Sequence, residues 1–88
     1  MINPGTSGII LSVEEAGADM AVIANGTFKK AGDPAIAFIC DDEGRRVIDC
    51  PDGDYEYTVM APNHVTNTGT INVERGSRRR LDVEMVRV

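Results

Sequence analysis

The stretch "DCPDGDYEYTVMAPNHV", residues 49–65, decides the fold class because it places an alternating segment between two turn signals. The proline and the glycine of "CPDG" form the first signal, since proline fixes φ and glycine accepts positive φ values. Behind this turn, Tyr55, Tyr57 and Val59 occupy alternate positions. A period of two is typical of a β-strand with one buried face. Residues 54–61 are therefore predicted to form a strand between two corners.

The rest of the chain shows the same alternation or short apolar runs, with turn residues at roughly eight-to-twelve-residue spacing. No long stretch carries a helical pattern that is free of turn residues. We therefore expect an all-β chain of seven to eight strands in a sandwich or small barrel. The predicted strands are residues 8–13, 20–24, 27–30, 35–40, 45–49, 54–61, 65–74 and 78–88.

Three local patterns predict how some of these strands are joined. Asn25-Gly26 is a strong signal for a tight hairpin between residues 20–24 and 27–30, because both residues tolerate positive φ. The run "AIAFIC" (35–40) is apolar at every position, which favours a strand that is central in its sheet or covered on both sides. It is expected to form a hairpin with "RRVIDC" (45–50) around "DDEG". Gly69 indicates a bulge or a close backbone approach.

Composition excludes several classes of protein. Eighty-eight residues fit one domain, which we place at residues 8–88 behind an N-terminal arm, residues 1–7. The formal net charge of -5 argues against nucleic-acid binding, which depends on neutralising phosphates. The sequence shows neither a signal peptide nor a transmembrane segment. We expect no membrane partner and synthesis in the cytoplasm, with a virion as one destination.

Three short motifs, in this order and at this spacing, resemble the carboxypeptidase regulatory-like domains. "CDDEG" (40–44) is similar to the T-D-x-x-G turn of that family, and "PDGDY" (51–55) matches its P-x-G-x-Y corner. "APNHV" (61–65) resembles its A-x-G-Y turn, with departures at Asn63 and His64, as Cys40 departs in the first motif. The resemblance implies a transthyretin-like (prealbumin-like), Ig-like Greek-key sandwich of seven strands. The residues expected to define its turns are Asp41, Gly44, Pro51, Gly53, Tyr55 and Asn63.

Domains of this family are generally accessory, so the resemblance implies that catalysis takes place elsewhere. The residues agree, because His64 is the only histidine and no G-x-S-x-G elbow accompanies it. We expect no enzyme activity and no cofactor. The acids at residues 41–43 and 49–54 offer oxygen ligands for Ca²⁺, but aspartate is also common in turns, so no metal site is predicted.

The cysteines and lysines carry two further alternatives. Cys40 and Cys50 are expected to be small buried thiols that are too far apart to bond across the predicted hairpin. Related collagen-adhesin repeats carry an internal cross-link to a lysine. Here Lys29 and Lys30 are the only lysines and the pattern identifies no partner for them, so no cross-link is predicted.

A docking role therefore falls on the arginine run and the arm. Arginine is enriched at interfaces, although a charged edge strand also blocks unwanted pairing. We expect a protein partner or a homo-oligomer. The leading hypothesis is an accessory subunit of a virus or phage particle, as a head decoration or tail component. The alternative is an adhesion or carbohydrate- or matrix-binding module of a larger cell-surface or secreted protein. The candidate partner-binding residues are Ile2, Asn3, Pro4, Arg75, Arg78, Arg79 and Arg80.

Overall fold

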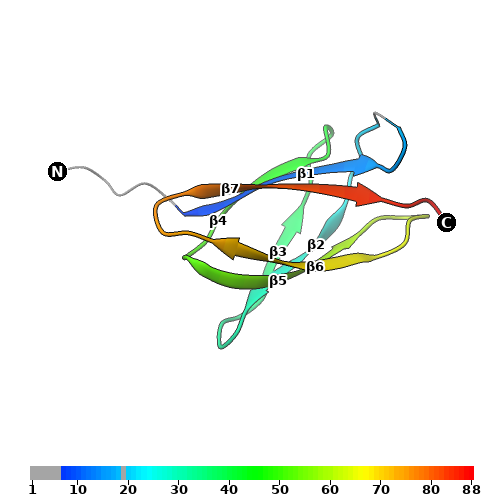
Figure 1. Ribbon diagram of the computed structural model, residues 1–88. Coiled ribbons are helices and arrows are strands. Elements are labelled where there is room, and N and C mark those ends of the chain that lie inside the picture. Colours follow the sequence, from blue (N-terminus) through cyan, green and yellow to red (C-terminus); the bar gives the residue numbers. More distant parts are fainter. Residues whose placement is uncertain (1–6, 19) are drawn as a thin grey trace.

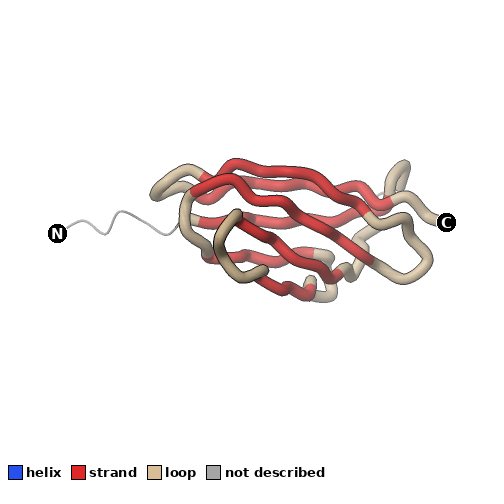
Figure 2. The backbone as a smooth tube through the Cα atoms, turned by 90° about the horizontal axis from the view of Figure 1, so that it is seen from below, coloured by secondary structure: helices blue, strands red, loops and turns tan. Residues whose placement is uncertain are grey.

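The computed structural model describes residues 7–18 and 20–88, and these residues form strands and turns without a helix. The prediction of an all-β sandwich is confirmed, since the strands lie in two layers, β4-β1-β7 and β3-β2-β5-β6 (Figure 1). Figure 2 shows the same strands from below, with the loops that join them. The strands are β1 (Gly8–Glu15), β2 (Asn25–Lys30), β3 (Ile36–Ile39), β4 (Arg45–Asp49), β5 (Gly53–Met60), β6 (Asn67–Val73) and β7 (Arg78–Met85).

Strand β1 organises the three-stranded sheet. It pairs antiparallel with β4 and parallel with β7, so the two ends of the described chain are joined in one sheet. Ile9, Leu11 and Val13 point inward and are fully buried. The intervening residues point outward because successive side chains of a strand alternate between faces.

The alternation predicted for residues 54–61 is confirmed in β5. Tyr55 and Val59 are buried, and Tyr57 packs against the core from a half-buried position. The rings of Phe28 and Tyr57 lie 6.0 Å apart between centroids, in a tilted arrangement that aromatic pairs favour. The inward positions predicted on β6 and β7 are also confirmed, at Ile71, Val73, Val83 and Met85 among the buried residues and at Leu81 among the partly buried ones.

The predicted hairpin at Asn25-Gly26 is wrong. Both residues belong to β2, and the Gly26 backbone packs so closely on β5 that a β-carbon would overlap the carbonyl oxygen of Thr58. The glycine therefore serves close strand packing rather than a turn. Of the segment 20–24, only Ala21 forms a β-bridge, with Glu14.

The prediction that residues 35–40 form a central strand is also wrong. β3 pairs only with β2 and forms the edge of its sheet, where the Ile39 side chain is 69% exposed. β4 lies in the other sheet, so residues 41–44 connect the two layers and do not close a hairpin. Gly69 stands opposite Tyr57 in a regular register without a bulge, and its close neighbour is the Tyr57 side chain rather than backbone.

The turn residues hold the connections by local bonds. The Asp41 carboxylate accepts hydrogen bonds from the amides of Glu43 and Arg45 at 2.9 and 3.0 Å. These bonds to the charged form lower the pKa of Asp41. Gly44 has a φ of 71°, and its backbone carbonyl accepts a hydrogen bond from the Val13 amide, which continues the pairing of β4 with β1 by one residue.

The corner before β5 and the turn after it each contain one residue with a positive φ. The Tyr55 hydroxyl donates a hydrogen bond of 2.7 Å to the Pro51 carbonyl, and Gly53 between them has a φ of 143°. Asn63 has a φ of 62°, the left-handed conformation that asparagine tolerates. Both turns thus place a permissive residue where the backbone needs one.

Ser7, which is predicted to belong to the arm, makes contacts with the sandwich. Its carbonyl accepts a hydrogen bond from the Cys50 amide, and its hydroxyl oxygen accepts one from the Gly76 amide. Residues 1–6 of the predicted arm lie outside the described residues. Across residues 7–18 and 20–88 we find no helix of the length and apolarity needed to cross a bilayer.

Candidate partner-binding face

The outer face of the three-stranded sheet exposes an apolar pair at its centre. Ile10 of β1 lies opposite Val47 of β4, and their side chains are 40% and 50% exposed. Ser12 follows Ile10 on the same face, two positions along β1. An apolar centre with a polar rim is the arrangement that protein interfaces show.

Three arginines surround this pair. Arg45 lies beside Ser12 on β4, and Arg80 lies beside Ile10 on β7. Arg78 stands next to Gly8, and its guanidinium reaches over the glycine to the Asp49 carboxylate at 2.9 Å. We call the set Ile10, Ser12, Arg45, Val47, Arg78 and Arg80 the arginine face.

The guanidinium groups of the arginine face are only partly neutralised. Arg80 donates to Asp82 on its own strand at 3.1 Å, while Arg45 reaches Glu43 only at 3.9 Å. The Arg45 and Arg80 side chains remain 67% and 75% exposed. A shallow hollow between them is lined by Ile10, Leu11 and Ser12. The hollow thus presents two guanidinium groups and one hydroxyl group beside apolar side chains. This combination suits a carboxylate carried on a protein chain.

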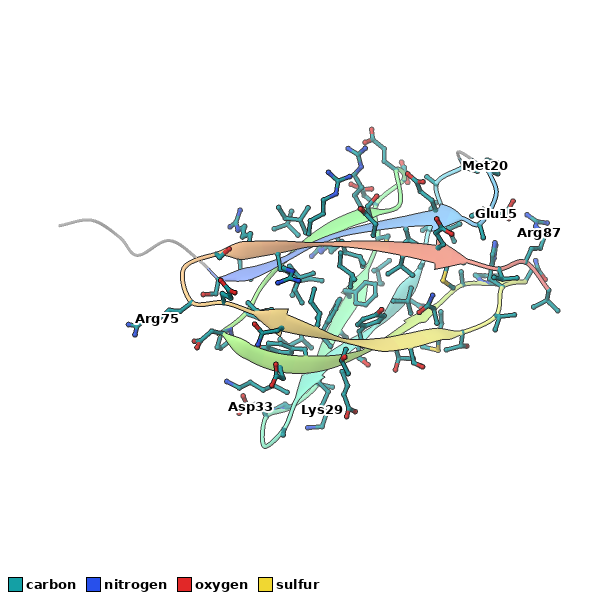
Figure 3. The ribbon with its side chains drawn as sticks, in the orientation of Figure 1. Glu15, Met20, Lys29, Asp33, Arg75 and Arg87 are labelled. Carbon is teal, nitrogen blue, oxygen red and sulfur yellow. The ribbon has the colours of Figure 1, made fainter. Side chains whose placement is uncertain are left out.

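The predicted partner-binding residues do not all meet on this face. Arg78 and Arg80 lie on it, whereas Arg79 faces the other side of β7, opposite inward-pointing Ile9. Arg75 lies in the turn between β6 and β7, away from the sheet (Figure 3). Ile2, Asn3 and Pro4 lie outside the described residues.

Sequence reasoning missed Ile10, Arg45 and Val47 as members of this face. The alternation in "GIILSV" placed Ile10 opposite the core residues Ile9 and Leu11, which was the only local signal. The approach of Arg45 and Arg80 depends on the pairing of β1 with β4 and β7. Strand pairing between distant segments has no short-range sequence signal.

A second polar cluster lies at the opposite end of β1. The Glu15 carboxylate accepts hydrogen bonds from Arg87 Nε and from His64 Nε2, both at 3.0 Å. Glu15 and Arg87 lie together at this end in Figure 3. The bond from Arg87, followed by that from His64, lowers the pKa of Glu15 below its usual range. The cluster joins the end of β1 to the 61–65 turn and the C-terminal segment.

The His64 side chain is only 8% exposed, less than expected for a turn histidine. Its Nδ1 lies 2.8 Å from the Pro62 carbonyl and its Nε2 lies against Glu15, so both ring nitrogens face acceptors. The ring forms one wall of a shallow hollow that Met20 and Ile23 also line. The imidazole therefore links the 61–65 turn to the end of β1.

The acidic turns distribute their carboxylates among separate partners. Asp41 binds backbone amides, Asp49 binds Arg78, and Asp54 accepts a hydrogen bond from Asn72 at 2.7 Å. Within the described ranges, no three histidine, cysteine or acidic side chains converge as metal ligands. Lys30 donates to the Asp52 carbonyl at 2.8 Å, and Lys29 donates to the Asp33 carbonyl.

Cys40 and Cys50 are both buried and unbonded to each other, as expected of small core thiols. Burial raises the pKa of each thiol above its ordinary value. A raised pKa keeps the sulfur protonated and therefore unreactive.

No family model matches this chain, and no curated protein matches its sequence. Solved structures with a similar fold include the Bacillus anthracis TIE protein, with a TM-score of 0.79 and 16% identity over 92% of this chain and 17% of that one. A DUF3823 family protein from Parabacteroides merdae has a TM-score of 0.68 and 16% identity over 97% of this chain and 48% of that one.

These likenesses show the fold alone, because the identity is 16% in both cases. They support the class of two-sheet β-sandwich domains. The chain spans about a sixth of the length of the first protein and about half of the second.

Proposed function

We propose that this chain is a non-catalytic binding protein that docks through its arginine face onto a carboxylate-bearing surface of a partner protein. The observation that carries the proposal is the exposed Ile10–Val47 pair flanked by Arg45 and Arg80. Arginine and aliphatic side chains together favour binding. Burial of the apolar pair stabilises the complex, and the guanidinium groups make it selective for a partner that carries carboxylates.

The charge of the whole chain supports oriented docking. Its formal net charge is -5, so most of its surface repels an acidic partner. On the arginine face, Arg78 and Arg80 pair with Asp49 and Asp82, and the Arg45 and Arg80 side chains stay largely exposed beside Ile10. Attraction for a carboxylate is therefore local to this hollow and orients the partner at short range. Residues Arg78 and Arg80 of the sequence prediction thus keep their proposed role, and Arg45 joins them.

We place this binding protein as an accessory subunit of a larger assembly, such as a head decoration or tail component of a virus or phage particle. Support comes from analogy with other small sandwiches that stabilise particles, which is an argument from fold. The noncatalytic role is supported by His64, whose ring nitrogens are both engaged in loop contacts.

The test uses purified particles of the source that lack the protein. Added wild-type chain is expected to bind them in many copies, and the double substitution Arg45→Glu with Arg80→Glu is expected to abolish binding. Arg79→Glu is the matched control, because Arg79 lies on the same strand but faces the other side. Binding that survives the double reversal, or that is lost equally with Arg79→Glu, contradicts the proposed face.

One observation favours a second function, a module of a larger cell-surface or secreted protein that recognises matrix or carbohydrate. The TIE protein and the DUF3823 family protein are longer chains, and the matching part covers 17% and 48% of them. Against a carbohydrate platform, Phe28, Phe38 and Tyr55 are buried and Tyr57 is half-buried. Glycan binding that is unchanged by Arg45→Glu with Arg80→Glu favours this alternative over the first.

We also propose that the sandwich has the Greek-key, transthyretin-like arrangement of the carboxypeptidase regulatory-like domains. The turn at Asp41, the corner from Pro51 to Tyr55 and the left-handed Asn63 support this assignment, since each bends the chain where the family motifs place a turn. An experimental structure with a different strand order refutes it.

A further inference from the structure

The edge strand β3 stands apart from the other sheet edges in composition. Its residues Ile36–Ile39 are all apolar and carry no charge. Edges β4 and β7 carry arginines and acids, which oppose pairing with another chain. Edge β6 is polar, and Asn67 ties it to β7 by donating to the Glu84 carbonyl at 3.0 Å. Among the described strands, β3 is thus the edge least protected against strand addition.

The backbone of β3 presents a defined set of unpaired groups. Cys40 donates its amide to the Ala24 carbonyl on the β2 side at 2.8 Å, so the amides of Phe38 and Ile36 also point toward β2. The amides and carbonyls of Ala37 and Ile39 therefore point away from the sheet. The exposed side chain of Ile39 and a shallow hollow lined by Ala37, Phe38 and Arg46 lie beside them.

We infer that β3 pairs with β3 of a second copy of this chain, antiparallel about a two-fold axis at Phe38. In this register Ala37 of each copy lies opposite Ile39 of the other, and each such pair exchanges two hydrogen bonds. All the outward amides and carbonyls of Ala37 and Ile39 are then paired by the same groups of the partner copy. The two sheets become one continuous sheet, and Ile39 packs against Ala37 across the junction.

Charge complementarity favours a second copy in this orientation. The chain has acids directly after β3, at Asp41, Asp42 and Glu43, and Lys29 on β2 beside the start of β3. Antiparallel pairing brings Asp41 of each copy, where the chain turns from β3 toward β4, to about two strand spacings, roughly 10 Å, from Lys29 of the other copy. Glu56 stands opposite Lys29 on β5, so the attraction is small and bears on the orientation of the pair rather than on its strength. Figure 3 shows Lys29 and Asp33 at this outer end of the β2–β3 loop. A parallel addition would instead place like charges together.

This inference does not depend on the proposed function, because β3 and the arginine face belong to different sheets. One strand pair buries little area, so we expect a weak dimer with a Kd of about 10–100 µM. The experiment is sedimentation equilibrium of the full chain from about 1 µM to about 1 mM protein, a range that brackets this Kd. Wild-type chain that remains monomeric up to the highest concentration overturns the inference.

Two substitutions test the edge itself. Ala37→Pro removes an outward amide from each copy without removing a bond to β2, and should raise Kd about thirtyfold, the effect of two lost hydrogen bonds. Ile39→Lys should have a similar effect, because it places a charge on the edge. Val86→Lys is the matched control, because Val86 is an exposed apolar residue beyond the end of β7 and belongs to neither surface, and it should leave Kd unchanged. A dimer that persists in both edge variants, or one lost only in the control, refutes β3 pairing.

The charge argument has its own test. Lys29→Glu should weaken the dimer, and adding Asp42→Lys to the same chain should restore it, since each reversal then meets its complement across the axis. Circular dichroism and thermal unfolding of each variant establish that the change lies in association and not in folding. Failure of the second reversal to restore association overturns the antiparallel orientation.

Discussion

Tyr55 acts at the scale of a single residue, by closing the corner that starts β5. Its ring is buried, and its hydroxyl donates to the Pro51 carbonyl at 2.7 Å. We expect Tyr55→Phe to lower the free energy of unfolding by about 1 kcal/mol, the usual net effect of one hydrogen bond. Denaturant unfolding measures this, with Tyr57→Phe as the control of equal chemistry. An equal loss in both variants contradicts a specific role for the Tyr55 bond.

The ionisation of Tyr55 gives a prediction with a defined sign. Burial, followed by the hydrogen bond with Cys50, raises the pKa of Tyr55 to about 12. Because the folded-state pKa is raised, this stabilisation is complete below about pH 10, the pKa of an unfolded-chain tyrosine. It is lost as the pH rises toward the folded-state pKa. Ultraviolet titration of tyrosinate should show a delayed component, and this component should vanish in Tyr55→Phe.

Asn63 adopts a left-handed backbone conformation that is strained for most residues. Its φ of 62° is the only positive value at a residue other than glycine among those described. Asn63→Ala should lower the free energy of unfolding by about 1 kcal/mol, because a residue with a β-carbon and no local hydrogen bond is strained there. Asn63→Gly should be tolerated. Thermal unfolding distinguishes the two, and equal losses contradict the left-handed conformation.

At the scale of the strand, substitutions at Asn25 and Gly26 distinguish the predicted hairpin from the strand that the structure shows. In a tight hairpin both Asn25 and Gly26 would be costly to replace. In β2, Asn25 is exposed, whereas a β-carbon at Gly26 would meet the Thr58 carbonyl. We expect Gly26→Ala to cost about 3 kcal/mol, typical of overpacking, and Asn25→Ala to cost little. Denaturant unfolding of the two variants decides between them.

The strands differ in how well the sequence predicts their buried positions. Alternation in β5, β6 and β7 identified the buried positions Tyr55, Val59 and Val83, because one buried face imposes a period of two. The uniformly apolar run at residues 35–40 misled the prediction, since Ile39 of β3 is exposed on an edge. Local composition does not specify which edge of a sheet lacks a neighbour. The Asn25-Gly26 turn signal failed because the glycine is needed for close packing against β5, a distant segment of the chain.

The candidate face was predictable to a similar extent. Alternation correctly placed Arg78 and Arg80 on one side of β7 and Arg79 on the other. Their approach to Arg45 requires β1 to lie between β4 and β7, which depends on pairing between the first and last strands. Local periodicity carries the direction of each side chain, whereas tertiary pairing decides which directions converge.

At the scale of the whole molecule, the Glu15 cluster holds the C-terminal segment against β1. Glu15 receives bonds from Arg87 and His64, and the Val65 amide donates to the Val86 carbonyl beside them at 2.8 Å. The pKa of Glu15 is lowered by these contacts, with Arg87 first. Its contribution to stability is therefore present above about pH 4.3, the pKa of an unfolded-chain glutamate, and is lost as the pH falls through the folded-state value.

Glu15→Gln should thus destabilise the protein at neutral pH and have a much smaller effect at acidic pH, where the wild-type carboxylate is also protonated. Denaturant midpoints measured across this range check the prediction, with Glu14→Gln as the control, since Glu14 is the adjacent residue and is exposed on the outer face. Hydrogen exchange at the amides of Val65 and Val88 gives an independent measurement, because both amides donate to the chain across this junction. Faster exchange at these amides is expected in Glu15→Gln at neutral pH. If the pH dependence of Glu15→Gln equals that of wild-type protein, the carboxylate does not secure the C-terminal segment.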